Sequence, residues 1–282
     1  MPDHQDQLPI TICIPVRNEE KNLGPCFESI GSHFAEVVVA DSFSTDSTRS
    51  IAESNGAKVV DFKWNGGYPK KRNWMLQEYK FETPWVLFLD ADERITAEFV
   101  EELRRVIPST DLVGFWISYN NWFMLKRLRY GDQFRKLSLF RVGAGEYERF
   151  GENLQGILDI EVHEHPVLDG EVGAIQARLE HHEYRGMEHY IAKHNAYSSW
   201  EAKRCFLMLE SPQQSWQEMT RRQRFKYAYL DRWWLGLFYF FISYVVKLGF
   251  LDGRAGWYFN RLKTRYFADI RLKIIEIRQS KK

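Results

Sequence analysis

The first hundred residues alternate between short, wholly apolar runs and longer stretches whose apolar residues recur at helical spacing. The apolar runs are Ile10–Ile14, Val37–Ala40, AKVVDF and the beginning of WVLFLDADER. The stretches after them predict helices at about Glu20–Ile30, after Ser44 or Asp46, in YPKKRNWMLQEY, and in TAEFVEELRRVI with Thr96 as its cap. Strands that are apolar throughout are typical of a parallel sheet covered on both faces. The pattern therefore predicts an α/β fold with a mostly parallel central sheet flanked by helices.

Acidic residues gather where these strands end. Ligands of open α/β sheets bind beyond the carboxyl ends of the strands, and here those ends carry Pro15–Glu19, Asp41 and Asp90–Asp92. Because like charges at one edge repel, we expect a cation among them, and Mg²⁺ or Mn²⁺ with a substrate diphosphate is the simplest candidate. The alternative is that the aspartates only stabilise turns. No glycine-rich GxGxxG motif follows any of these strands, which disfavours a Rossmann redox enzyme.

The second half of the chain offers a candidate general base. The segment LQGILDIEVHEHPVLDG contains Asp159, Glu161 and Glu164 beside His163 and His165. A carboxylate within hydrogen-bond reach can take the proton of an attacking hydroxyl group. The histidines in this half fit no common structural zinc spacing and have no cysteine nearby, so a zinc site is not expected.

The last third of the chain is basic and aromatic. The net charge is only +1, yet residues 221–282 hold 15 Lys and Arg against 4 Asp and Glu. Leu235–Leu251 is nearly apolar, but Lys247 interrupts it and it is short for a spanning helix. Its Trp and Tyr residues suit a membrane interface, and its cations suit anionic headgroups. We therefore expect residues 211–282 to form a helical tail on a membrane surface. A buried helical pair or a dimer contact is the alternative, and nucleic-acid binding is disfavoured because the run is too apolar.

Cysteine usage and the first residues bear on the compartment. The three cysteines, Cys13, Cys26 and Cys205, show no paired spacing, which argues against a disulfide framework and for a reducing compartment. The opening MPDHQDQLP does not read as a secretory signal. We expect a cytoplasmic protein that is peripheral on the inner face of the cell membrane.

Four sequence motifs resemble those of a known protein family. TICIPVRNEEKNL, VVVADSFSTDST, GYPKKRNWML and WVLFLDADER are similar, in register and order, to the successive motifs of family 2 glycosyltransferases, which have the GT-A fold. The resemblance implies a catalytic domain at residues 8–210 that binds a nucleotide-diphosphate sugar, with UDP as the usual nucleotide. It implies donor-binding roles for Pro15, Arg17, Glu19, Asp41, Lys71, Asn73, Asp90 and Ala91, and a metal-binding role for Asp92. Asp41 would bond the base and Asp90 the ribose.

The resemblance also implies the reaction. In envelope enzymes of this family a VHE segment occupies the place of VHE in this chain, so Glu164 would be the base of an inverting transfer, with Asp159 and Glu161 as alternatives. His181 or His182 lies where the family often has a histidine near the donor phosphates.

The acceptor is less defined by the residues. The wording of the motifs, and GFLDGRAGWYFN near the end, resemble bacterial enzymes that glycosylate a lipid-linked saccharide in lipopolysaccharide core, capsule or similar synthesis. Arg135 and Arg141 could meet an anionic acceptor or be ordinary surface arginines. A polyprenyl-phosphate glycosyltransferase and a non-catalytic, membrane-tethered sugar-nucleotide binder are the alternatives.

Overall fold

The computed structural model describes residues 7–148, 166–182, 185–210 and 221–280. The chain divides into two compact units. The sheet unit comprises Met1–Trp122 and Gln133–Tyr184, and the helical unit comprises Phe123–Asp132 and Arg185–Lys282.

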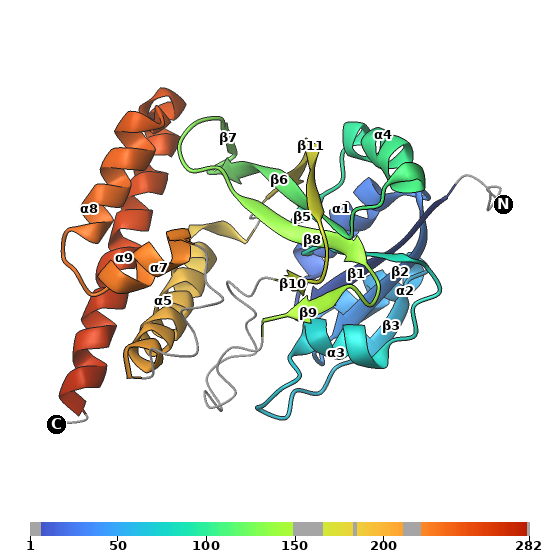
Figure 1. The fold of residues 1–282 in the computed structure, drawn as a ribbon, viewed down its shortest axis with the longest axis horizontal. Coiled ribbons are helices and arrows are strands. Elements are labelled where there is room, and N and C mark those ends of the chain that lie inside the picture. The colour runs from blue at the N-terminus through green and yellow to red at the C-terminus, as the bar shows by residue number, and fades with distance from the viewer. Residues whose placement is uncertain (1–6, 149–165, 183–184, 211–220, 281–282) are drawn as a thin grey trace. The chain divides into compact units, whose positions relative to one another are not determined.

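A mixed sheet forms the centre of the sheet unit (Figure 1). Its strands follow one another in space in the order β3-β2-β1-β4-β8-β6-β11-β5. The pairs β3–β2, β2–β1, β1–β4 and β6–β11 are parallel, whereas β8 is antiparallel to both of its neighbours and β5 is antiparallel to β11. The strands are β1 Leu8–Val16, β2 Phe34–Asp41, β3 Lys58–Asp61, β4 Trp85–Phe88, β5 Glu93–Arg94, β6 Gly114–Phe123, β8 Arg135–Arg141 and β11 Val172–His181. A separate ribbon pairs β9 Gly145–Tyr147 with β10 Pro166–Leu168.

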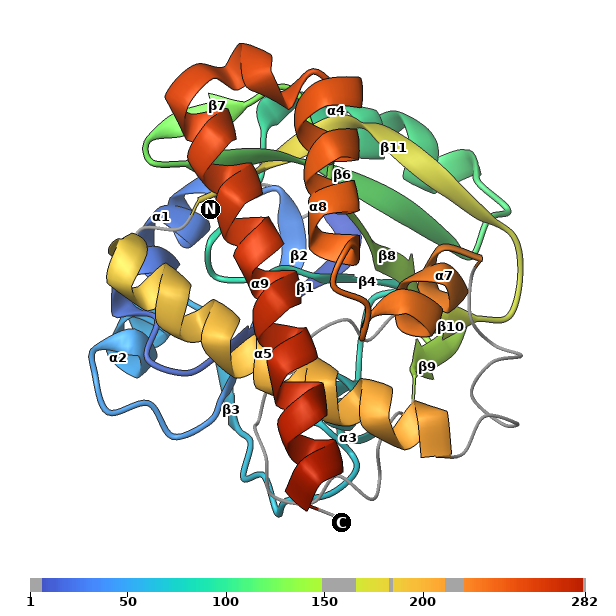
Figure 2. The ribbon, with the colours of Figure 1, turned by 90° about the vertical axis from the view of Figure 1, so that its left-hand side faces the viewer.

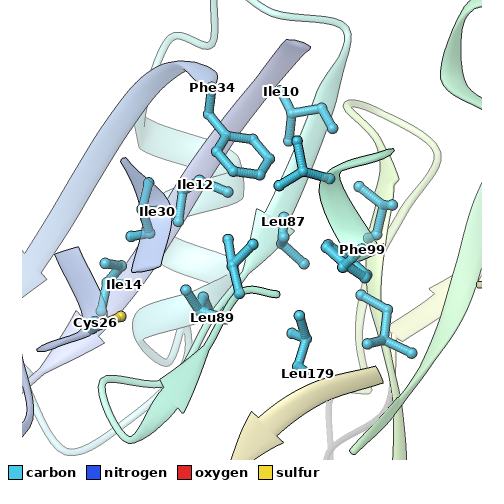
Figure 3. Packing of buried hydrophobic residues seen from close by; sticks show 14 of the residues in the cluster. Ile10, Ile12, Ile14, Cys26, Ile30, Phe34, Leu87, Leu89, Phe99 and Leu179 are labelled. Atoms are coloured by element: carbon cyan, nitrogen blue, oxygen red, sulfur yellow. The ribbon is translucent and has the colours of Figure 1, made fainter. Parts of the chain in front are cut away.

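Helices cover both faces of this sheet, as the wholly apolar strands predict. One face packs its alternate residues, such as Ile12 of β1 and Leu87 of β4, against α1, α2 and α4 (Figure 3). The other face packs Cys13 and Phe88 against α3 and the β9–β10 ribbon. These helices are α1 Glu20–Ile30, α2 Thr48–Ser54, α3 Lys71–Glu78 and α4 Ala97–Val106, which continues into the 3₁₀ turn η2 Ile107–Ser109. The α/β architecture expected of a GT-A fold is confirmed.

Side-chain hydrogen bonds lie at the starts of two helices, α4 and α2. Thr96 accepts a hydrogen bond from the Phe99 amide at 3.3 Å and caps α4, as expected. Asp46 accepts from the Thr48 amide at 3.0 Å, at the start of α2. Ser44 instead bonds Asp41, so it belongs to the turn after β2 and does not cap the helix.

The helical unit is built around two long helices, α5 Gly186–Glu210 and α9 Gly253–Ser280, which pack against each other (Figure 2). Shorter helices accompany them: α7 Arg221–Tyr229, α8 Leu235–Phe240, the π-helical turn η3 Phe241–Val246 and the 3₁₀ turn η4 Gly249–Asp252. The short strand β7 Lys126–Leu128 also belongs to this unit. By its packing, α5 belongs to the same compact unit as the helices that follow it. The division into a catalytic domain at residues 8–210 and a tail at residues 211–282 stays a prediction.

The apolar run Leu235–Leu251 is broken in the middle. The chain turns at Lys247 and Leu248, where Leu248 has φ 59°. Among the described residues, no single helix has the length and apolar character needed to cross a bilayer. The pair Leu235–Val246 and Gly249–Ser280, bent by 75°, meets those criteria only when taken together.

Candidate active site

The acidic edge predicted from the sequence forms at the carboxyl ends of β1, β2 and β4. After β4 the chain turns through Asp90, Ala91 and Asp92 and enters β5, which pairs with the end of β11. This antiparallel pairing places His181 beside the turn. The His181 Nε2 atom lies 3.6 Å from Asp92 Oδ2, and the His182 amide donates to the Asp92 carbonyl at 2.8 Å.

A lysine lies among the carboxylates of this edge. Lys136 of β8 donates through Nζ to Asp90 Oδ2, and to Glu93 Oε1 at 2.6 Å. Arg72 of α3 donates to the other oxygen of Asp90 at 2.8 Å. Glu93 is fully buried, and it also accepts from the Asp90 amide at 3.1 Å. We call Lys136, Arg72, Asp90 and Glu93 the edge network.

The edge network shifts the pKa of each carboxyl group in a different direction. Burial acts to raise the pKa of Asp90, but the charges of Lys136 and Arg72 outweigh it and hold that pKa well below its usual range. Burial prevails at Glu93 and raises its pKa, although Lys136 opposes the rise. Burial would lower the pKa of Lys136, but Asp90 and Glu93 raise it well above its usual value. Asp90 and Lys136 are therefore firmly charged.

The edge network bears on the divalent cation expected at this edge. Repulsion among the carboxylates pointed to a divalent cation, but Lys136 and Arg72 already supply positive charge at Asp90. A metal is therefore not required to hold the edge together. Asp92 remains the candidate residue for binding one. The signal for Lys136 was present in the sequence as a lysine inside the strand KLSLF, but only the pairing of β8 with β4 brings it to the edge.

Asp92 and His181 lie together at the turn after β4. The Asp92 side chain is almost buried, and the His181 side chain is 29% exposed. Burial acts to lower the pKa of His181, but the neighbouring Asp92 carboxylate outweighs it and raises that pKa. Among the described residues no group of three or more His, Cys, Asp or Glu side chains is placed to hold a metal. The Asp92 carboxylate is the kind of oxygen ligand that Mn²⁺ or Mg²⁺ takes together with a substrate diphosphate and water, whereas His181 would have to be neutral to bind a metal.

The residues predicted to bind the nucleotide lie at the carboxyl ends of β1 and β2. Asp41 is buried and accepts from the Ser44 amide at 3.1 Å and from the Ser44 hydroxyl at 2.6 Å. Glu19 is half-buried and accepts from Asn22 Nδ2 at 2.7 Å. Pro15 is half-buried and Arg17 is exposed. These positions share the edge that holds Asp92, as the sequence predicts.

One aromatic residue beside Asp41 was not foreseen. Phe43 has φ 54° and a side chain that is 56% exposed. A bulky residue with positive φ is an outlier, and such outliers gather at ligand sites. The signal in the sequence was weak, since Phe43 is one apolar residue within a polar turn.

Other predicted donor residues make contacts within the protein. Lys71 is buried and donates through Nζ to the Val16 carbonyl at 3.0 Å. Asn73 uses its amide to pair with both backbone groups of Tyr147, at 2.9 and 2.8 Å. Ala91 is buried, and its carbonyl accepts from Arg94 at 2.8 Å. Their donor-binding roles stay predictions, and the contacts seen here hold elements in place.

The acceptor side is described only in part. Glu164, Asp159, Glu161, His163 and His165 lie outside the described residues.

Arg135 and Arg141, which the sequence allows either to meet an anionic acceptor or to be ordinary surface arginines, differ in their contacts. The Arg135 guanidinium lies 4.7 Å from the Trp116 ring centroid and is exposed. Arg141 donates to the Leu112 and Thr110 carbonyls at 3.2 and 2.7 Å, which ties the end of β8 to the segment that leads into β6.

The carboxyl ends of β6 and β11 form a second polar group beside His181. Glu180 accepts from Asn120 Nδ2 at 2.6 Å and from the indole nitrogen of Trp122. The His182 ring stacks on Trp122 with centroids 5.0 Å apart. Because side chains alternate along a strand, this group lies on the sheet face opposite to His181.

Comparison with known proteins identifies the family. Residues 11–150 match the model of Glycosyl transferase family 2. The lipopolysaccharide core biosynthesis glycosyltransferase LpsC of Rhizobium meliloti is 30% identical over 211 residues, which cover 70% of this chain and 71% of LpsC. A protein of Rickettsia felis named an uncharacterized glycosyltransferase is 26% identical over 69% of each chain.

Solved structures are more distant. Glucosyl-3-phosphoglycerate synthase of Mycobacterium tuberculosis, in complex with Mn²⁺, UDP and glucosyl-3-phosphoglycerate, is 23% identical over 40% of this chain and 44% of its own, with a TM-score of 0.31. Residues 1–349 of S. aureus TarS align with 97% of this chain and 92% of that one at 15% identity, with a TM-score of 0.43. The family model and LpsC, with the motifs now placed at one sheet edge, show that this chain belongs to glycosyl transferase family 2.

Proposed function

We propose that this chain is an inverting glycosyltransferase that moves a sugar from a UDP-sugar to a lipid-linked saccharide during synthesis of a bacterial envelope glycan. The observation that carries the proposal is the pairing of Asp92 with His181 beside the edge network, at the carboxyl edge of the sheet. The printed role of LpsC, lipopolysaccharide core biosynthesis, supports the envelope glycan as product class.

The edge residues suggest how the donor is held. Asp41 offers carboxylate oxygens for the base, and Asp90 keeps two charged oxygens in fixed positions for ribose hydroxyl groups because Arg72 and Lys136 hold it. Asp92 would hold a Mg²⁺ or Mn²⁺ ion with the diphosphate, and His181 would join it only as a neutral imidazole. Such an ion supplies positive charge that stabilises the departing diphosphate.

The base and the acceptor remain proposals from the sequence. Glu164 would accept the proton of the acceptor hydroxyl as the sugar carbon is attacked from the face opposite the leaving group. Removal of such a base costs about 10²–10⁴-fold in rate. We expect Glu164→Gln to keep nucleotide binding and lose transfer. If the variant transferred sugar at the wild-type rate, a phosphate acceptor, which needs no strong base, would be favoured instead.

The basic and aromatic helices support a membrane location. Residues 221–282 carry the excess of cations together with exposed Trp and Phe side chains, among them Trp233 and Phe241. A lipid-linked acceptor at the inner face of the cell membrane would be reached by a cytoplasmic enzyme that binds this surface.

A thermal-shift titration tests the donor site. UDP with Mn²⁺ or Mg²⁺ is expected to stabilise the wild type by about 2.7 kcal/mol at a hundredfold excess over the dissociation constant. Asp92→Ala should lose the metal-dependent part of the shift. The matched control is Asp169→Ala, which removes an exposed aspartate in the turn before β11 and should keep the full shift. Absence of a nucleotide shift in the wild type with either metal would overturn the proposal.

Turnover separates the enzyme from a non-catalytic binder. Radiolabelled UDP-sugars with a bacterial lipid extract should yield a labelled lipid product with wild type and with Asp169→Ala. Tight nucleotide binding without a product from any lipid extract would favour the binder.

A further inference from the structure

Three apolar residues of the helical unit adopt a backbone conformation that such residues rarely accept. Met124 has φ 50° and Leu125 φ 60°, and together they form the two-residue turn between β6 and β7. Leu248, at the start of η4, has φ 59°. A two-residue turn with positive φ at both positions favours Asn-Gly or Gly-Gly, and long side chains there are strained.

These strained residues are also exposed. The Leu125 side chain is 91% exposed, and Met124 and Leu248 are 54% and 44% exposed. Phe250 and Leu251 follow in η4 at 44% and 51%. Backbone outliers cluster at functional sites, and exposed apolar side chains that lie together mark interaction surfaces.

Hydrogen bonds join the turn segment to η4. Asp252, buried at the end of η4, accepts from the Arg129 and Tyr130 amides at 3.0 Å each. Lys126 Nζ donates to the Asp252 carbonyl at 2.7 Å, and the Gly131 amide donates to the Lys247 carbonyl at 2.9 Å. Residues 124–131 and 247–252 therefore form one connected surface, which we call the tip.

The tip has a one-sided charge. Its exposed cations are Lys126, Arg127, Arg129 and Lys247. The acidic residues of residues 123–132 and 247–258 are only Asp132 and Asp252. Asp252 is buried, and Asp132 pairs with Lys247 at 2.7 Å. Apolar side chains surrounded by exposed cations are complementary to the acyl boundary and the headgroups of an anionic bilayer.

We propose that the tip is the part of this protein that enters an anionic phospholipid bilayer, with Met124, Leu125, Leu248, Phe250 and Leu251 as its inserting side chains. The inference rests on the membrane association in the proposed function and deepens it. It locates the contact at the bend between η3 and η4 and adds the β6–β7 turn, which lies outside residues 211–282. The proposed membrane contact does not extend along α9.

Vesicle flotation tests this inference with the full chain. Wild type should bind vesicles of phosphatidylcholine with about 30 mol% phosphatidylglycerol, and should bind pure phosphatidylcholine more weakly. Raising the salt from about 0.1 M to about 0.5 M should weaken binding to the anionic vesicles, because the Debye length shortens. A wild type that floats with neither vesicle would overturn the proposal.

The central variant combines Met124→Asn with Leu125→Gly. These residues suit positive φ, so the variant should fold at least as stably as wild type in thermal unfolding. It loses two apolar side chains, and its affinity for the anionic vesicles should fall by about tenfold or more. Leu251→Glu tests the η4 half of the tip and should act in the same direction. Wild-type affinity in both variants would contradict the proposal.

Leu272→Glu is the matched control. Leu272 is 59% exposed and lies on α9, about 30 Å along the helix axis from its start. The affinity of Leu272→Glu for the anionic vesicles should equal that of wild type. A loss of affinity equal to that of the tip variants would place the contact along α9 instead of at the tip. A UDP thermal shift is measured on every variant. If wild type binds UDP but no vesicle, the proposed membrane contact at the tip is wrong and the proposed UDP site is unaffected. If wild type binds vesicles but shows no UDP shift, the proposed contact at the tip holds and the proposed donor site is wrong.

Discussion

Lys136 pairs with two carboxylates at one edge of the sheet. Its ammonium group lies between Asp90 and Glu93, and its side chain is 25% exposed while that of Glu93 is fully buried. Removing one member of a buried ion pair leaves the other charge without compensation, which costs more than the pair contributes.

We therefore expect Lys136→Met to lower the free energy of unfolding by about 2–3 kcal/mol, with the partial exposure of Lys136 reducing the cost. Urea unfolding without ligand measures the change. Lys58→Met, which removes a 57% exposed lysine from its pair with Glu36, is the control and should cost at most about 1 kcal/mol. Adding Glu93→Gln to Lys136→Met should recover about 1 kcal/mol or more, because the buried charge is gone. A purely additive double variant would show that the two residues are not coupled.

Asp90 gives the unfolding free energy a pH dependence of known sign. Its pKa in the folded protein is held below that of the unfolded chain by Lys136 and Arg72, against the effect of burial. Its contribution to stability is therefore present above about pH 4 and is lost as the pH falls towards the folded pKa. Urea unfolding between about pH 7 and pH 3 should show a smaller loss in Asp90→Asn than in wild type.

Glu93 is the control, because its contribution to the unfolding free energy changes with pH in the opposite direction. Burial raises the pKa of Glu93, so its contribution is unfavourable once the pH has risen through that pKa. Glu93→Gln should remove this unfavourable part and steepen the loss on acidification. The same direction of change in both variants would contradict the assignment of the two carboxyl groups.

At the scale of elements, Asn73 connects α3 to the β9–β10 ribbon. Its side-chain amide satisfies both the N–H and the C=O of Tyr147, which are buried. The family resemblance implies that Asn73 binds the sugar-nucleotide donor, and the two roles make different predictions.

Asn73→Ala should lower the free energy of unfolding by about 2 kcal/mol, because two buried backbone groups lose their partner. Thermal unfolding without ligand measures this loss. Gln77→Ala is the control on the same helix, since Gln77 bonds Tyr68 and Glu146 at an exposed position and should cost less than about 1 kcal/mol. Unchanged stability of Asn73→Ala together with weaker UDP binding would restore the donor role.

The elements of the sheet unit followed the sequence closely where the signal was local. Residues 20–30 form α1 as expected, and the four apolar runs give the strands β1 to β4, with Ala57 and Phe62 of the third run outside β3. Short apolar runs between turn residues favour strands that are buried on both faces. The short β5 was missed, because two residues, Glu93 and Arg94, carry no periodicity.

The whole molecule places its three thiols in protected positions, two in the sheet unit and one in the helical unit. Cys13, Cys26 and Cys205 are free and buried. Burial raises the pKa of Cys26 and of Cys205 to about 12, and raises that of Cys13 well above its usual value. Since the thiolate is the reactive form, native thiols should be inert.

A thiol reagent at neutral pH should leave the native protein unmodified over minutes in which the urea-unfolded chain reacts at all three sites. Cys205→Ala leaves thiols in the sheet unit alone, so its reaction in intermediate urea reports the opening of that unit. Rapid modification of the native wild type would show that a cysteine is exposed in solution.

The sequence by itself determined the family motifs, the strands of the first half and the edge at which Asp41, Asp90 and Asp92 meet. These follow from local periodicity and from the rule that parallel strands end at one edge. Only the tertiary structure decided what neutralises that edge. Lys136 and His181 arrive on β8 and β11, and their positions depend on strand order and register, which no local pattern encodes. The same holds for the tip, because the bonds of Asp252 join a turn and a helix far apart in the chain.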